Sequence, residues 1–216
     1  MLDIHNLMTS LALRRALFHS EADFQQELAL EIRRAWVDCP IRLEFPPFPD
    51  RDKRMAFDIW LPGVDIPIEL KYFIRKYDGT VAGERFSLAN QAARDHKRYD
   101  FLRDIQRIED IAAYYESAYC GFAVLLTNDP LLWERREPAD VVDAEFHIYD
   151  GRRIGDSNMH WSNSASDGTK RSREEPISLS RSYVLNWRNY SALGEKRGER
   201  FRYLAVSIPP VKEKTP

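Results

Sequence analysis

The chain has 216 residues, 44% hydrophobic and 31% charged, which suits one well-cored domain and is short for two. Its 32 basic and 34 acidic residues give a formal net charge of −2, so bulk charge does not indicate nucleic-acid binding, which usually brings a basic surplus. No apolar run approaches the roughly 18 residues of a membrane span, and we expect no membrane partner. The N-terminus lacks the cleavage site of a secretory signal. The only cysteines, Cys39 and Cys120, favour a reducing, cytoplasmic location over a disulfide framework.

The first third of the chain predicts two helices and three strands. Leucines at helical spacing predict a short helix over 4–18. Ser20, followed by acidic residues, is typical of the N-cap of a second helix that ends before Pro40. Apolar and alternating runs predict strands at 41–45, 55–61 and 66–74. The short links between these strands favour an antiparallel meander.

The middle of the chain predicts a long helix and a buried strand. Ser87 is a plausible cap for a helix over 88–117. The run at 120–129 is almost wholly apolar, which is typical of a central strand. The long helical link between strands 66–74 and 120–129 allows a parallel crossover.

The C-terminal part, residues 131–216, reads as an accessory β-rich extension. Residues 151–175 are rich in Gly, Ser and Asn and predict an irregular loop. Further strands are predicted at 144–150, 182–187 and 201–208. The whole order predicts a single α/β domain, 1–216, with a mixed sheet flanked by helices.

Residues 57–73 read FDIWLPGVDIPIELKYF and carry three charges, Asp58, Glu69 and Lys71, among bulky apolar residues. Strand alternation puts Glu69 and Lys71 on one face. A turn centred on 63–64 places Asp58 opposite Glu69, with Cβ atoms about 4.5–5.5 Å apart. Two carboxylates that close repel unless a proton or cation lies between them. Mg²⁺ binds one or two carboxylates together with waters and phosphate oxygens, so these residues indicate a metal site.

The spacing alone is weakly specific, because an acid two residues before a lysine arises about once by chance in such a chain. Two instances occur, Glu69 with Lys71 and Asp95 with Lys97. The second falls in a predicted helix, where residues two apart do not share a face, so the first is the candidate. The simpler interpretation of the first is an ion pair on a solvated sheet face.

At these residues the sequence resembles the PD-(D/E)xK nuclease superfamily, which has a restriction-endonuclease-like αβββαβ core. Phe57-Asp58 stands at the family's Pro-Asp position, and Glu69-Leu70-Lys71 stands at its (D/E)xK position. The resemblance covers residues 20–130. The stretches SEADFQ and NQAARDHKRYDF are similar to a bacterial branch of that superfamily.

The resemblance implies a Mg²⁺-dependent nuclease, with Mn²⁺ as the alternative ion. Asp58, Glu69 and the Leu70 carbonyl would bind the metal, and Lys71 would orient or deprotonate the attacking water. An acid from the first helix of the core often completes such a site. Glu21 and Glu27 are both candidates, and Glu21 lies nearer the centre of the helix's inward face at 100° per residue.

The same resemblance implies DNA as the substrate and endonucleolytic cleavage. Gln91, Arg94 and Arg98 would then face the nucleic acid, although a solvated helix surface also explains them. Cleavage of both strands by a one-site protein implies a homodimer. Two other functions stay open: a non-catalytic nucleic-acid- or protein-binding module of a defence or repair system, and a nuclease acting on RNA.

Overall fold

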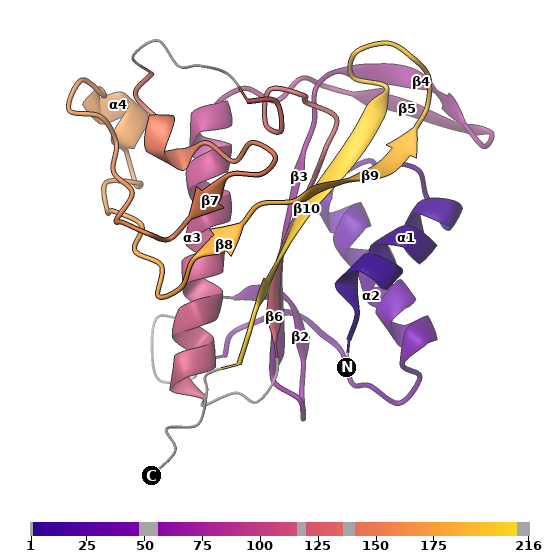
Figure 1. The fold of residues 1–216 in the computed structure, drawn as a ribbon. Helices are drawn as coiled ribbons and strands as arrows, with labels where there is room; N and C mark the ends of the chain where they lie inside the picture. The colour runs from indigo at the N-terminus through magenta and orange to yellow at the C-terminus, as the bar shows by residue number, and fades with distance from the viewer. Residues whose placement is uncertain (1, 48–55, 116–119, 136–140, 211–216) are drawn as a thin grey trace.

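The structure, a computed structural model, describes residues 2–47, 56–115, 120–135 and 141–210 and has an α/β fold. The six strands of its main sheet are β1 (Arg42–Phe45), β2 (Phe57–Leu61), β3 (Ile66–Phe73), β6 (Gly121–Thr127), β9 (Trp187–Ala192) and β10 (Arg200–Ile208). Their spatial order is β1-β2-β3-β6-β10-β9. The three longer helices are α1 (Ile4–Arg14), α2 (Glu21–Ala35) and α3 (Arg94–Tyr114). Helices α1 and α2 cover one face of the sheet and α3 the other (Figure 1), which confirms the predicted class.

The N-terminal helices follow their sequence signals closely. The Ser20 hydroxyl accepts a hydrogen bond from the Asp23 amide and caps α2 as predicted. Helix α1 ends at Arg14, earlier than the predicted 18, because the chain turns and buries Leu17 and Phe18 in the core. No helix in the described ranges is long and apolar enough to cross a membrane.

The sheet combines an antiparallel meander with a parallel crossover. Strands β1, β2 and β3 pair antiparallel, and Ile59 lies opposite Ile68, which is the register that the predicted turn implies. Strand β3 then pairs parallel with β6, placing Lys71 beside Leu125. Every residue of β6 is buried, as its apolar run predicts for a central strand.

The segment before α3 corrects the prediction of a helix over 88–117. Strands β4 (Tyr77–Val81) and β5 (Glu84–Leu88) form a hairpin there, and α3 begins only at Arg94. Ser87 is therefore a strand residue and not a cap. Phe86 and Leu88 alternate with exposed neighbours and bury one face of the hairpin. This alternation of buried and exposed residues is typical of a strand and explains why the predicted helix does not form here. The last two residues of the predicted helix lie outside the described residues.

The C-terminal third supplies both β9 and β10 to the main sheet, rather than only an extension. The prediction of a strand at 144–150 is wrong, because a short 3₁₀ helix, η1, spans Ala144–Phe146. The Arg152 guanidinium binds the carbonyl oxygens of Ala144, Glu145 and His147, so these groups are not available to a strand ladder. The chain between β6 and β9, which packs against α3 and is called the C-terminal lobe below, also contains β7 (Arg153–Ile154), α4 (Asp167–Lys170) and β8 (Tyr183–Val184).

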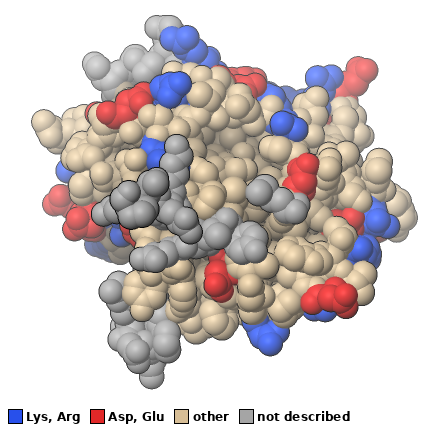
Figure 2. Space-filling model, turned by 60° about the horizontal axis from the view of Figure 1, so that its bottom comes forward, with Lys and Arg blue, Asp and Glu red and all other residues tan. Residues whose placement is uncertain are grey.

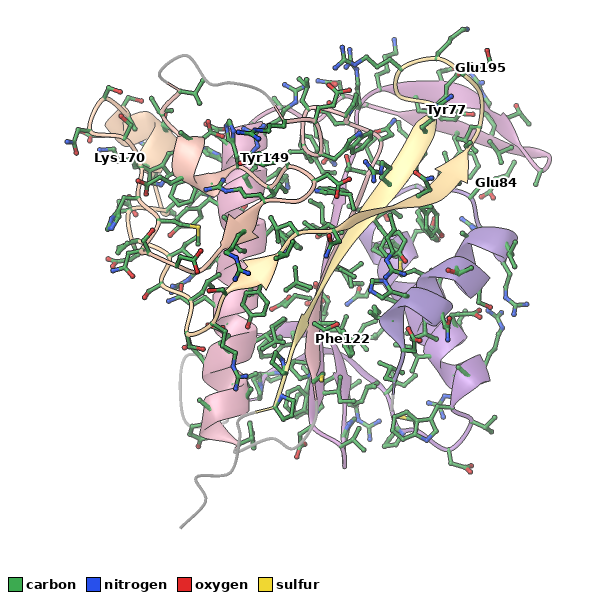
Figure 3. The ribbon with its side chains drawn as sticks, in the orientation of Figure 1. Tyr77, Glu84, Phe122, Tyr149, Lys170 and Glu195 are labelled. Carbon is green, nitrogen blue, oxygen red and sulfur yellow. The ribbon has the colours of Figure 1, made fainter. Side chains whose placement is uncertain are left out.

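Alternation along the strands divides the core into two layers. Leu70 and Tyr72 pack with α1 and α2, whereas Phe73 and Leu125 pack with α3 and the C-terminal lobe. Phe122, labelled in Figure 3, lies on β6 between the helical layers. Glu69 and Lys71 have the same parity as Phe73, so they point into the layer beneath α3.

Replacement of Leu125, which is 0% exposed on β6, tests this core. We expect Leu125→Ala to lower the free energy of unfolding by about 2–5 kcal/mol, because it removes buried contacts and leaves a cavity. Leu13→Ala, at a side chain 86% exposed, should change it by less than about 0.5 kcal/mol. Equilibrium urea unfolding measures both, and equal effects would contradict the assigned core.

Candidate functional site

The predicted site lies where β2 separates from β3. Ile59 and Ile68 form the last pair of the β2–β3 ladder on the side away from the turn. Past this pair, two carboxylates and not a neighbouring strand accept hydrogen bonds from the β3 backbone. The Leu70 amide donates to Asp58 Oδ2 at 2.5 Å, and the Tyr72 amide donates to Glu21 Oε2 at 2.7 Å. Asp58 and Glu21 are thus fixed side by side along one edge of β3.

Helix α2 holds this edge through a second contact. Gln25, one turn after Glu21, donates from Nε2 to the Asp58 carbonyl at 2.6 Å and to Glu44 Oε1 at 2.7 Å. Of the two acids considered for the site, Glu21 contacts β3. This placement follows from its position on the inward face of α2, where Phe24 and Leu28 are buried.

Glu69 and Lys71 make their closest ion pairs with α3. Lys71 Nζ lies 2.7 Å from Asp104 Oδ2, and Glu69 Oε1 lies 2.9 Å from Arg107 Nη1. Glu69 is 3% exposed and Asp104 4% exposed. The simpler interpretation, a Glu69–Lys71 pair on a solvated sheet face, therefore does not describe this face, which lies buried under α3.

Arg107 is anchored independently of Glu69. Its Nη2 donates to the Ala56 carbonyl at 2.7 Å, its Nη1 lies 3.5 Å from Asp104 Oδ1, and its Cζ lies 5.1 Å from the centre of the Phe57 ring. Arg107 can keep these three contacts while its interaction with Glu69 changes.

The buried cluster contains more acids than bases. Asp58, Glu69 and Asp104 provide three carboxylates, against the two cations Lys71 and Arg107. Burial raises the pKa of Glu69 well above its usual range, repulsion by Asp104 and Asp58 adds to this, and Arg107 and Lys71 offset only part. Burial also raises the pKa of Asp104 to about 6, although Lys71 and Arg107 oppose it. One carboxylate in the cluster therefore lacks a compensating positive charge.

Lys71 remains a cation in this setting. Burial alone would lower its pKa, but the charges of Asp104 and Glu69 raise the pKa above the usual lysine value. Its ammonium also donates to the Leu70 carbonyl at 3.2 Å. Lys71 is therefore held between Asp104 and the backbone of its own strand.

The oxygen atoms at this position have the chemistry of a Mg²⁺ site. Among the described residues no three His, Cys, Asp or Glu side chains group as a metal site, so an ion would need backbone oxygen and water as well. The contacts above use Oδ2 of Asp58 and Oε1 of Glu69, and each carboxylate has a second oxygen. The Leu70 carbonyl has a second lone pair beyond the Lys71 contact. Two carboxylates and a carbonyl, completed by waters, suit Mg²⁺ or Mn²⁺.

The three residues expected to face nucleic acid lie elsewhere. Gln91 precedes α3, and its backbone and side chain hydrogen-bond to the backbone of Ile74, the residue after β3. Arg94 pairs with buried Asp129. Arg98 lies 2.5 Å from Asp143 and donates to the Leu131 carbonyl. Arg98 is six residues before Asp104 on α3, about 9 Å along the helix axis, so these arginines are engaged in a separate network.

Sequence reasoning did not find Asp104 and Arg107. Asp104 lies in the apolar stripe of α3, between Leu102 and Ile105, which are both 0% exposed. A charge inside such a stripe is the signal that could have identified it, because an unpaired buried charge is costly. Arg107, three residues later, shares the same helix face.

No protein-family model, curated protein or solved structure matches the chain.

The charge excess predicts that Glu69 destabilises the metal-free fold. A raised carboxyl pKa means that the native state keeps a proton that the unfolded chain releases, so stability is lost as pH rises through the native pKa. Glu69→Gln mimics the protonated acid. We expect this variant to unfold at higher urea concentration than the parent at about pH 8, with a smaller difference at about pH 5. Chelator-treated samples should be used, and a difference independent of pH would contradict the assignment.

The Arg98–Asp143 pair predicts a structural role for Arg98. Burial alone would raise the pKa of Asp143, but hydrogen bonding to His147 and the charge of Arg98 lower it to about 2. This stabilisation is present at neutral pH and is lost only as pH falls toward 2. We expect Arg98→Met to lower the free energy of unfolding by about 3 kcal/mol, because it leaves Asp143 buried without its cation. Unchanged urea unfolding would instead favour a role confined to ligand contact.

Proposed function

We propose that this protein is a divalent-cation-dependent nuclease that hydrolyses phosphodiester bonds, with DNA as the substrate class. The observation that carries the proposal is the gathering of Asp58, Glu69, Lys71 and Glu21 where β2 leaves β3. Carboxylate oxygens, a backbone carbonyl and a cationic lysine are the groups that phosphoryl transfer requires.

The order of the elements supports the same proposal. Helix α2, strands β1 to β3, helix α3 and strand β6 occur in the order of the αβββαβ core of the PD-(D/E)xK superfamily, with the β4–β5 hairpin inserted between β3 and α3. We propose that this part has the restriction-endonuclease-like fold. In the antiparallel meander followed by a parallel pairing of β3 with β6, Asp58 lies on β2 and Glu69 and Lys71 lie on β3, both of them interior strands of the sheet.

In this proposal Asp58, Glu69 and the Leu70 carbonyl hold the ion. When bound, the ion lowers the pKa of a water ligand and offsets charge on the phosphate and the leaving oxygen. It would also offset the excess of the carboxylates of Asp58, Glu69 and Asp104 over the cations Lys71 and Arg107. Gln25 and the Leu70 amide keep Asp58 in place, and Arg107 fixes one oxygen of Glu69.

The protonation state of Lys71 limits the role that it can have in the reaction. Because its pKa is raised, Lys71 is protonated at neutral pH and is a poor proton acceptor. We assign it the role of stabilising negative charge on a phosphate oxygen, and not of deprotonating the water. Glu21, along the same edge of β3, is the carboxylate we assign to accept the water's proton.

A non-catalytic binding module is the second candidate. It is favoured by the ion pairs that Glu69 and Lys71 already make with α3. Figure 2 shows basic and acidic side chains scattered next to one another over this face, with no continuous basic patch among its described residues. The electrostatic footprint of a duplex-binding surface is therefore weak there.

A nicking assay separates the two candidates. We expect Mg²⁺ or Mn²⁺ to support nicking of supercoiled plasmid, and Asp58→Asn or Lys71→Met to reduce the rate by about 10²-fold or more, since each removes a charge that acts in the transition state. Asp78→Asn, at an exposed residue of the β4–β5 hairpin, is the matched control and should keep activity.

The outcomes are distinct. Metal-independent cleavage, or cleavage unaffected by both site variants, would contradict the proposed nuclease. Binding of plasmid without cleavage under any divalent ion would favour the module. Faster cleavage of single-stranded RNA than of DNA would change the substrate class. Linear product formed without a nicked intermediate, together with a dimeric mass, would support paired active sites in a homodimer.

A further inference from the structure

Asp104 is the one buried carboxylate of the cluster that belongs to neither β2 nor β3. It comes from α3, is 4% exposed, and lies 2.7 Å from the Lys71 ammonium. The proposed nuclease chemistry gives Asp104 no part in holding the ion. Its position therefore needs a separate explanation.

The ammonium of Lys71 has other carboxylates within electrostatic reach. Besides Asp104, the charges of Glu69 and Asp58 act on it, and both are proposed to hold the ion. An ammonium that moved to either carboxylate would occupy oxygen atoms that a divalent cation needs. The contact with Asp104 draws the ammonium toward α3 instead. The ammonium also donates to the Leu70 carbonyl at 3.2 Å, which keeps a second lone pair for the ion.

We propose that Asp104 is a positioning residue that holds the Lys71 ammonium on the α3 side of the site and so keeps Asp58 and Glu69 open to a divalent cation. This inference rests on the proposed function, because it concerns the same cation site. Arg107 supports the arrangement from the same helix. It lies 3.5 Å from Asp104 Oδ1 and is tied to the Ala56 carbonyl, so Asp104 is fixed between two cations.

The proposal differs from simple attraction between Asp104 and the cation. If Asp104 acted only as a nearby negative charge, its removal would weaken cation binding equally whether or not Lys71 is present. If Asp104 acts by holding Lys71, its removal matters only while the lysine can compete for the carboxylates. A double-mutant cycle measures this difference, because it isolates the coupling between two residues.

The experiment measures Mn²⁺ and Mg²⁺ binding to the full chain by titration calorimetry, with no nucleic acid. Asp104→Asn keeps the shape of the side chain and removes its charge. We expect it to weaken binding about tenfold or more, the usual effect of losing a partner that orients a metal site. In the Lys71→Met background the same change should alter affinity by less than about twofold, since no ammonium remains to compete.

Asp100→Asn is the matched control. Asp100 lies on the same helix and pairs with Arg173 at 2.7 Å, outside the cluster, so this variant should bind cations like the parent. Thermal unfolding of each variant establishes that it is folded. The double variant loses both members of the ion pair together and leaves no buried charge without its partner, which favours its folding.

A measurement on the unsubstituted chain covers the case in which Asp104→Asn does not fold. The ¹⁵Nζ ammonium signal of Lys71, identified by its absence in Lys71→Met, should be protected from exchange with water. It should stay protected after saturation with Mg²⁺. Loss of this protection on adding the ion would overturn the proposal, because Lys71 would then have left Asp104.

The remaining outcomes also decide the matter. Equal weakening by Asp104→Asn in both backgrounds overturns the positioning role while the cation site, and with it the proposed function, stands. No cation binding by the parent chain overturns the proposed function and the positioning role together. Weakening that disappears in the Lys71→Met background supports the proposal.

Discussion

Burial of more negative than positive charge beneath α3 is the constraint on which the site depends. Glu69 and Asp104 are almost fully enclosed, and an enclosed carboxylate is costly unless a cation or several hydrogen bonds compensate it. Arg107 and Lys71 compensate two of the three carboxylates that interact there. The remaining negative charge adds to the effect of burial in raising the pKa of Glu69, which favours binding of a proton there. A divalent cation is the other species able to balance it.

The backbone around this cluster fixes the carboxylates of Asp58 and Glu21 along one edge of β3. The pairing of β2 with β3 begins at Ile59, so Asp58, the residue before it, lies outside the ladder. Its carboxylate accepts a hydrogen bond from the Leu70 amide instead. Glu21 takes the next amide along the strand. Edge amides of β3 thus orient both acids, whereas in a continued ladder Asp58 would lie directly opposite Glu69.

The sequence predicts one half of this arrangement well. The alternation at Glu69 and Lys71, the register at Ile59 and the inward direction of Glu21 are local properties of single elements or of one tight turn, so periodicity is sufficient to obtain them. Asp104 and Arg107 lie more than 30 residues away from β3, and only the packing of α3 across the sheet brings them close. The β4–β5 hairpin was missed for a similar reason, because Phe86 stacks on His19, which lies in the link between α1 and α2, far away in the sequence.

The two cations of the cluster differ in how firmly they are held, and therefore in how easily each can move away from its carboxylate partner. Arg107 has a carbonyl, a carboxylate and an aromatic ring besides Glu69, so it keeps its place when one oxygen of Glu69 turns to another cation. Lys71 is a flexible point charge whose position depends on its partner. The rigid arginine is therefore suited to orienting Glu69, whereas the lysine needs Asp104 to hold it. A neutral residue at 69 would make the fold more stable. A function that needs the ionised form, such as binding of a cation, would explain the carboxylate at this position.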